Sequence, residues 1–156
     1  MRPPSGAAFL LAQLGAHTSN LFAARLAELG LSPAHVGVLR IVGQSPGLSQ
    51  QALSERLGAV PSRVVKLVDE LEARGLVERR RSETDRRNYA LHIADGAAAE
   101  VAAVRRAVGA HDSAVVKSLT AQELETLLVL LRKIAEAEGL NAEVHPGYGA
   151  RGDRSG

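Results

Sequence analysis

The chain contains no cysteine and no tryptophan, and it has only two phenylalanines and two tyrosines. Without cysteine the protein cannot form disulfides, bind a metal through thiolates or sense oxidants through a thiol, and the composition agrees with a reducing compartment. Few aromatic and many aliphatic side chains favour packed helices over a β-rich fold. We therefore expect a mostly α-helical protein.

Long apolar runs are missing as well. No segment approaches the roughly 18 apolar residues that a membrane-spanning helix needs. The apolar stretch from Ala7 to Leu14 is placed like a signal-peptide core, but Gln13 interrupts it and no small-residue cleavage pattern follows. We expect a soluble, cytoplasmic protein without a membrane partner. Its 156 residues fit one domain over 1–140.

The net charge is too small to indicate a partner by itself, since it is only +2. Its distribution is informative, because five arginines lie close together with only two acids, Glu83 and Asp85, between them. The five are Arg79, Arg80, Arg81, Arg86 and Arg87. This basic patch points to a nucleic-acid partner.

Hydrophobic periodicity predicts a winged helix-turn-helix over residues 32–93. Ser32-Pro33 starts one helix, Ser49 caps the next, and Gly58 ends that second helix in a tight turn. A third helix follows from about Pro61 to Arg74, and two helices joined by about three residues are typical of a helix-turn-helix. Beyond it, two strand-like runs, Leu76–Arg80 and Tyr89–Ile93, bracket a polar segment over 82–88. These runs predict a small β-hairpin wing with a basic tip.

Long helices are predicted on both sides of this lobe, over 6–30 and 95–139. The second region holds two helices, of which the latter opens with Thr120 and Glu123 in capping-box spacing. The first helix would be about 36 Å long, too long for a small lobe to cover its apolar stripe, so we expect these helices to form a homodimer. The glycine-rich tail over 141–156 is expected to be disordered.

The second helix of a helix-turn-helix lies in the DNA major groove, where polar side chains read the bases. A lone basic pair is more often a solvated helix face, but Arg63 and Lys66 follow a helix-turn-helix and precede a basic hairpin. Arg63 would pair with guanine, Lys66 would reach a base or phosphate, and a wing arginine would enter the minor groove. Our candidate DNA-binding residues are Ser49, Gln50, Ser62, Arg63, Lys66, Arg81, Asp85, Arg86 and Arg87.

From about Ala7 to Gly139 the sequence resembles the MarR (multiple antibiotic resistance regulator) family. The residues that carry the resemblance are Leu48–Leu53 (LSQQAL), Val64–Leu76 (VVKLVDELEARGL), Asp85-Arg86-Arg87 and Leu119–Leu124 (LTAQEL). The resemblance implies a triangular homodimer whose two winged lobes straddle a pseudo-palindromic site on double-stranded DNA. It also implies that Arg87 enters the groove and that Asp85 holds it in position.

One position departs from the family. Ile93-Ala94 stands where the family usually has Leu-Thr, so the usual cap of the following helix is missing. Asp95 is the alternative cap, which leaves the start of that helix open by about one turn.

Two histidines lie on the apolar sides of the long helices, His17 in the first and His111 in the second. The simpler interpretation is that each makes a hydrogen bond within the dimer core. The alternative is that both line a pocket for an effector, since members of the family often bind small aromatic or phenolic acids that release DNA. We expect no metal site and no cofactor, because the five histidines are scattered and no cysteine accompanies them.

Together these patterns predict a sequence-specific DNA-binding regulator, most simply a repressor that an effector releases from a palindromic promoter site. The protein is not expected to be an enzyme, because no glycine-rich phosphate loop, Gly-x-Ser-x-Gly or His-Glu-x-x-His is present. A winged-helix domain used only for protein contacts is the alternative, and a recognition face without basic side chains would indicate it.

Overall fold

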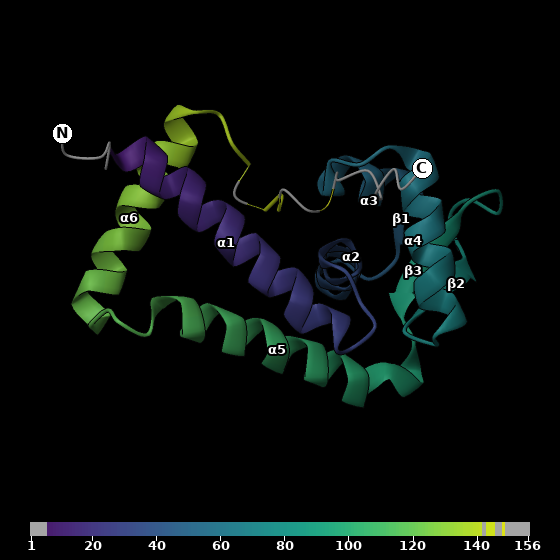
Figure 1. The fold of residues 1–156 in the computed structure, drawn as a ribbon. Helices are drawn as coiled ribbons and strands as arrows, with labels where there is room; N and C mark the ends of the chain where they lie inside the picture. The colour runs from purple at the N-terminus through teal and green to yellow at the C-terminus, as the bar shows by residue number, and fades with distance from the viewer. Residues whose placement is uncertain (1–5, 142, 146–147, 149–156) are drawn as a thin grey trace, which may run out of the picture.

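The computed structural model describes residues 6–141, 143–145 and 148. Three long helices, α1 (Ala7–Ala27), α5 (Ala98–Val116) and α6 (Ala121–Ala137), lie to one side of a smaller lobe (Figure 1). The lobe contains three shorter helices and a small antiparallel sheet. The prediction of a mostly helical winged helix-turn-helix is confirmed.

The helices of the lobe are α2 (Pro33–Gln44), α3 (Gln50–Leu57) and α4 (Pro61–Ala73). Ser32 and Ser49 cap α2 and α3 as predicted, each accepting a hydrogen bond from a backbone N–H three residues further on. Gly58 ends α3 with a φ of 66°, a left-handed conformation that favours glycine. Only two residues then separate this turn from α4, so α3 and α4 form the predicted helix-turn-helix.

The core of the lobe lies between α2, α3, α4 and the sheet. Helix α4 contributes a row of aliphatic side chains to it, and the buried members are Val64, Leu67, Val68 and Leu71. Each fully buried side chain of this size stabilises the fold by about 1.5–3 kcal/mol. Because one face of α4 is held in the core, its opposite face points outward.

The sheet has three strands in the order β1-β3-β2, all antiparallel: β1 (Leu48–Ser49), β2 (Val77–Arg81) and β3 (Tyr89–Ile93). The last two form the predicted hairpin, in which Arg79 pairs with Leu91 and Arg81 with Tyr89. Strand β1 was not predicted, because two residues are too few to show a period.

Helix α5 begins differently from the expectation. A 3₁₀ turn, η1 (Asp95–Ala97), precedes it, and no side chain caps either element. Asp95 as the cap is therefore wrong: Ala94 occupies the N-cap position of η1, while the Asp95 carboxylate lies 3.4 Å from Arg80. Helix α6, by contrast, opens with the predicted capping box, and hydrogen bonds from Thr120 hold the pKa of Glu123 below its usual value.

The described residues of the tail pack against the lobe, while most of the range predicted to be disordered, 141–156, lies outside the described part of the chain. Tyr148 is buried in the core of the lobe and Val144 packs against that core. The prediction rested on the glycine-rich composition and overlooked that these two large apolar side chains suffice to anchor a short segment. Residues 142, 146–147 and 149–156 lie outside the described part of the chain.

Candidate nucleic-acid interface

The outward face of α4 carries short and cationic side chains. Ser62 and Lys66 are exposed there, and the Lys66 ammonium is 3.8 Å from Glu70 with its side chain 77% exposed. Val65 is also exposed on this helix, at 40%, and sequence reasoning missed it. An exposed aliphatic group beside a lysine is chemically suited to meet a thymine methyl group.

Arg63 is not free on this face. Its side chain is part-buried, and its Nε donates a hydrogen bond to the backbone carbonyl of Tyr148 at 3.0 Å. The structure therefore separates two residues that the sequence placed together: Lys66 points into solvent, while Arg63 is bound to the C-terminal segment.

The loop between β2 and β3, residues 82–88, projects away from the long helices (Figure 1). Its own polar groups organise it, because the Ser82 hydroxyl accepts hydrogen bonds from the backbone N–H groups of Thr84 and Asp85. The backbone N–H of Ser82 also donates to the carbonyl of Asn88 at 3.1 Å. The loop is thus a defined turn at the tip of the wing.

Asp85 shapes the loop next to Arg87. Its carboxylate accepts hydrogen bonds from the backbone N–H of Arg87 at 3.0 Å and from the Asn88 side chain at 2.8 Å. The resemblance implied that Asp85 holds Arg87 in position. In the structure Asp85 binds the backbone N–H of Arg87 and not its guanidinium. Within the described residues, the guanidinium groups of Arg86 and Arg87 have no hydrogen-bond or ion-pair partner, so both charges face solvent.

Two of the three arginines of β2 have structural partners. Arg79 is only 16% exposed and forms ion pairs with Asp69 and Glu72 of α4, while Arg80 pairs with Glu78 and Asp95. These contacts fix the strand to the helix. Within the part of the chain that the structure describes, only three of the five arginines in the basic patch therefore keep their charge free for a DNA partner. They are Arg81, Arg86 and Arg87.

Ser49 and Gln50 lie at the start of α3, beside the wing. The Ser49 hydroxyl is the cap of α3, and the Gln50 amide oxygen accepts a hydrogen bond from Nε of Arg79 at 2.9 Å. Both residues line a small cavity of about 190 Å³ together with Arg87. The structure thus brings these three candidate residues together, and it places Ser62 and Lys66 separately on α4.

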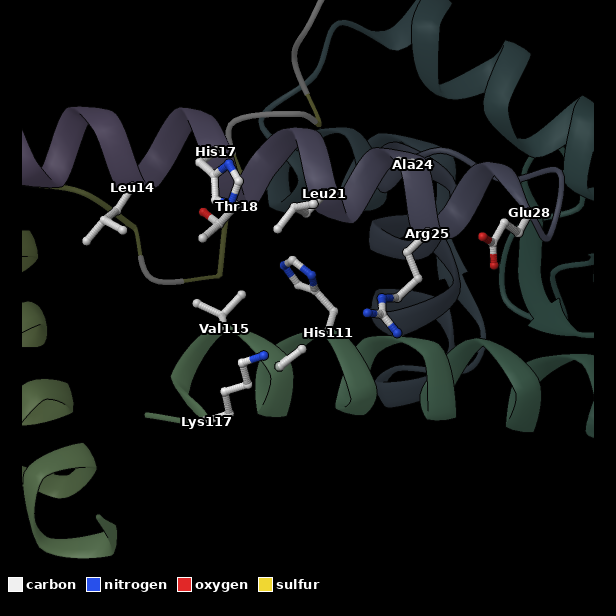
Figure 2. Close-up of a pocket in the computed structure, with 11 residues that line it drawn as sticks. Leu14, His17, Thr18, Leu21, Ala24, Arg25, Glu28, His111, Val115 and Lys117 are labelled. Carbon is white, nitrogen blue, oxygen red and sulfur yellow. The ribbon is translucent and has the colours of Figure 1, made fainter. Parts of the chain in front are cut away.

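A larger cavity of about 600 Å³ lies between α1 and α5, and both His17 and His111 line it (Figure 2). Its other walls are aliphatic apart from Thr18, two cationic side chains, Arg25 and Lys117, and one acid, Glu28. Sequence reasoning missed Arg25 and Lys117. The sequence shows each as a charge beside the apolar stripe of a long helix, a pattern without a distinctive spacing.

His111 sits between this cavity and the core. Its ring lies 5.0 Å from that of Phe22, and burial, followed by the positive charge of Arg25, lowers the pKa of His111, while Asp112 opposes the shift. A neutral imidazole is therefore favoured at neutral pH. With Arg25 and Lys117 nearby, the cavity combines apolar walls with positive charge, which suits an aromatic or aliphatic carboxylate.

Stability is expected to fall as the pH falls, because burial also lowers the pKa of His145, with a contribution from nearby His111. The folded protein then binds fewer protons than the unfolded chain just below pH 6.5, the ordinary histidine value. The stabilisation is complete above pH 6.5 and is lost as the pH drops toward the lowered values. We expect a lower Tm at pH 5.5 than at pH 7.5.

The same thermal measurement on a His111→Gln/His145→Gln protein should show a smaller drop in Tm between these pH values. His92→Ala is the control and should keep the full drop. An unchanged drop in the double variant would contradict the assignment.

Further features bear on the class of protein. Within residues 6–141, 143–145 and 148, no helix has the length and apolarity to cross a membrane, and no group of His, Asp or Glu is arranged to hold a metal ion. The helix-turn-helix, the hairpin with its exposed arginines and the flanking long helices define a winged helix-turn-helix protein.

Comparison with known proteins agrees with this class. Residues 29–88 match the MarR family. A protein of Thauera aromatica, named as a transcriptional regulatory protein for the hcr operon, is 36% identical over 105 residues. That alignment covers 67% of this chain and 63% of the relative, so it spans less than two thirds of the relative's length.

Solved structures show the same fold over most of the chain. The transcriptional repressor CouR, bound to a 23-mer DNA duplex, is 29% identical with a TM-score of 0.73, covering 83% of this chain and 92% of CouR. The Mycobacterium tuberculosis MarR family protein Rv2887, in complex with p-aminosalicylic acid, is 27% identical with a TM-score of 0.66, covering 84% and 99%. The chain belongs to the MarR family.

Proposed function

We propose that the protein is a homodimeric, sequence-specific DNA-binding transcriptional regulator that acts in the cytoplasm, most simply by repressing a promoter that it occludes. The observation that carries the proposal is the pair of exposed cationic elements on one lobe. Lys66 stands on the outward face of α4, and the guanidinium groups of Arg86 and Arg87 face solvent at the tip of the wing. CouR, a repressor seen on DNA, has this fold.

The two elements suit the two DNA grooves. A helix of about 10–12 Å diameter fits a major groove of about 12 Å, so α4 would present Ser62, Val65 and Lys66 to base edges. The wing would lie along the adjacent minor groove, whose negative potential attracts an inserted arginine. The hydrogen bond from the backbone of Arg87 to Asp85 would fix the direction in which that arginine leaves the loop.

The proposed dimer rests on apolar surface that a single chain leaves uncovered. No residue of α6 is buried, and the N-terminal half of α1 is equally bare. The exposed large apolar side chains of these two helices are Phe9, Leu10, Leu11, Leu14, Leu21, Leu128, Val129, Leu130 and Ile134. A second copy related by a twofold axis would cover both helices at once.

A footprinting experiment tests the proposal. Hydroxyl-radical cleavage of a duplex from the region upstream of the protein's own gene should reveal two protected half-sites about 10–10.5 base pairs apart, or a multiple of one helical turn, on an inverted repeat. Protection of a single half-site would contradict the dimer. No protection on any promoter fragment at low salt would contradict the DNA-binding function.

We further propose that the cavity between α1 and α5 binds a small aromatic or phenolic acid. The carboxylate would meet Arg25 or Lys117, and the ring would lie among the aliphatic walls near His17 and His111. Rv2887 has been solved with p-aminosalicylic acid and with salicylic acid. Such a ligand acts on DNA binding only if it favours a lobe spacing that no longer fits the operator.

The His17→Ala and His111→Ala proteins are expected to bind salicylate roughly tenfold more weakly than the parent, the effect of losing one good polar contact of about 1.4 kcal/mol. Isothermal titration measures the affinity, and His92→Ala is the matched control. Unchanged binding in both variants would contradict this location. It would favour the second cavity, of about 310 Å³, which lies between α2, β3 and α5 and has Arg40 and Arg105 in its wall.

A further inference from the structure

Tyr148 occupies a slot between α2 and α3 that only a glycine leaves open. The residue is 6% exposed, and a Cβ added at Gly37, on α2, would lie 2.7 Å from Cζ of the Tyr148 ring and 2.9 Å from Leu57. A glycine inside a helix costs about 1 kcal/mol relative to alanine. Here the glycine lets the aromatic ring lie directly on the helix backbone.

The residues just before Tyr148 are attached to the same lobe at separate points. Arg40, on α2, donates a hydrogen bond to the carbonyl of Glu143, and the Glu143 carboxylate lies 3.8 Å from Arg56 of α3. The Val144 side chain lies against the turn at Gly58, where an added Cβ would be 3.4 Å from it. The C-terminal segment therefore contacts α2, α3 and the turn that leads into α4.

His145 extends these contacts toward the long helices. Its ring centroid is 5.5 Å from that of Phe22 on α1 and 5.6 Å from that of Tyr148. Phe22 in turn lies 5.0 Å from His111, which lines the cavity between α1 and α5. The described tail residues thus run from Phe22, which contacts the cavity-lining His111, to Arg63 near the start of α4.

The contact with α4 uses a side chain that DNA binding would need. The Tyr148 carbonyl accepts the hydrogen bond from Nε of Arg63, and the Arg63 side chain is partly buried as a result. With Nε bonded to the tail, the side-on fork of Nε and Nη is closed to a guanine, and the part-buried side chain is held back from the groove. Lys66, one turn further along α4, has no such contact with the tail among the described residues.

Resting on the proposed function, we propose that Glu143, Val144, His145 and Tyr148 form an autoinhibitory strap that competes with DNA for Arg63. Opening the strap frees Arg63 for the major groove, and closing it returns Tyr148 to its slot. The apparent affinity for DNA equals the intrinsic affinity multiplied by the open fraction. In the proposed dimer both straps must open, so a strap closed in about seven of ten subunits lowers the affinity about tenfold.

Variants at position 148 test this competition on a fluorescein-labelled duplex from upstream of the protein's own gene and on a shuffled duplex. We expect Tyr148→Ala to bind the first duplex about tenfold more tightly than the parent, and Tyr148→Phe, which keeps the ring and the carbonyl, to match the parent. In an Arg63→Ala background, the gain from Tyr148→Ala should disappear. An equal or weaker affinity of Tyr148→Ala, or a gain that persists without Arg63, would overturn the strap.

A second measurement does not depend on how well Tyr148→Ala folds. The chain has two tyrosines and no tryptophan, so in a Tyr89→Phe protein Tyr148 is the sole fluorescent residue of this kind. Its emission should be protected from acrylamide in the free protein and should become quenchable when a duplex binds. Quenching at the rate of free tyrosine without DNA, or full protection with DNA bound, would overturn the proposal.

The two proposals fail in different ways. If neither the parent nor Tyr148→Ala binds any duplex at low salt, the DNA-binding function is wrong. The proposed competition for Arg63 is then wrong as well. If both bind the upstream duplex equally well, the function stands and only the strap is wrong.

Discussion

Replacing Val129 and Leu130 of α6 by aspartate is expected to convert a dimer into a monomer and to lower operator affinity by at least about a hundredfold. In the single chain these side chains are 58% and 52% exposed, so aspartate there disturbs no intrachain core. In the proposed dimer the two charges would be buried without partners, which is strongly unfavourable. The loss of affinity follows because linking two lobes raises affinity by about 10²–10⁴.

The dimer prediction is measured by size-exclusion chromatography with light scattering, followed by a DNA titration. Lys133→Glu is the matched control, because it changes the charge of α6 by the same two units at an exposed polar position. A parent protein that is already monomeric, or an aspartate variant that remains a dimer with full affinity, would contradict the proposed interface.

Alanine at Arg87 is expected to weaken operator binding about a hundredfold in the dimer. Each of the two wings would lose a contact of about 1.4 kcal/mol, which is tenfold in affinity. Because a cation at DNA releases counterions, the slope of log K against log salt should fall by about one per subunit. Arg106→Ala, which removes an exposed arginine from α5, is the control and should leave both quantities close to the parent values.

Two results would contradict the prediction for Arg87. If Arg87→Ala retained the parent affinity and salt slope while Arg86→Ala lost them, the groove-entering residue would be Arg86. If neither change mattered, the wing would not contact DNA, and the exposed arginines would serve only as a solvated loop.

The elements of the fold were predictable because their signals are local. The caps at Ser32, Ser49 and Thr120 and the turn at Gly58 each depend on residues within four positions of one another. The buried row of α4 follows from helical periodicity, which the core then confirms. The local signal was weak at two places. Asp95 was predicted to be a helix cap and is not one, and the two-residue strand β1 was not predicted.

The site was less predictable because its contacts join distant residues. Gln50 appeared free in the sequence, but Arg79, 29 positions away, donates to its side chain. Arg63 appeared free as well, and its partner Tyr148 is 85 positions away, in a segment whose composition suggested disorder. Charge and amphipathicity predict which side chains can reach DNA, whereas only the packed chain shows which of them already have a partner.

The residues of the effector pocket were predicted only in part. Periodicity placed His17 and His111 on the apolar sides of two helices, and the structure brings both to one cavity. A hydrogen bond within the dimer core and contact with an effector both stay predictions for these histidines. Arg25 and Lys117 escaped notice because a charge at the edge of an apolar stripe has no distinctive spacing.

Fluorescence anisotropy tests the central claim most directly. The purified protein would be titrated onto a labelled duplex from upstream of its own gene and onto a shuffled duplex of the same composition, at about physiological salt. The proposed regulator should prefer the first duplex by roughly a thousandfold or more, the range of specific DNA-binding proteins. Equal affinity for both duplexes would contradict specific recognition of this site, and no binding to either at low salt would contradict DNA binding and favour a winged-helix domain that contacts other proteins.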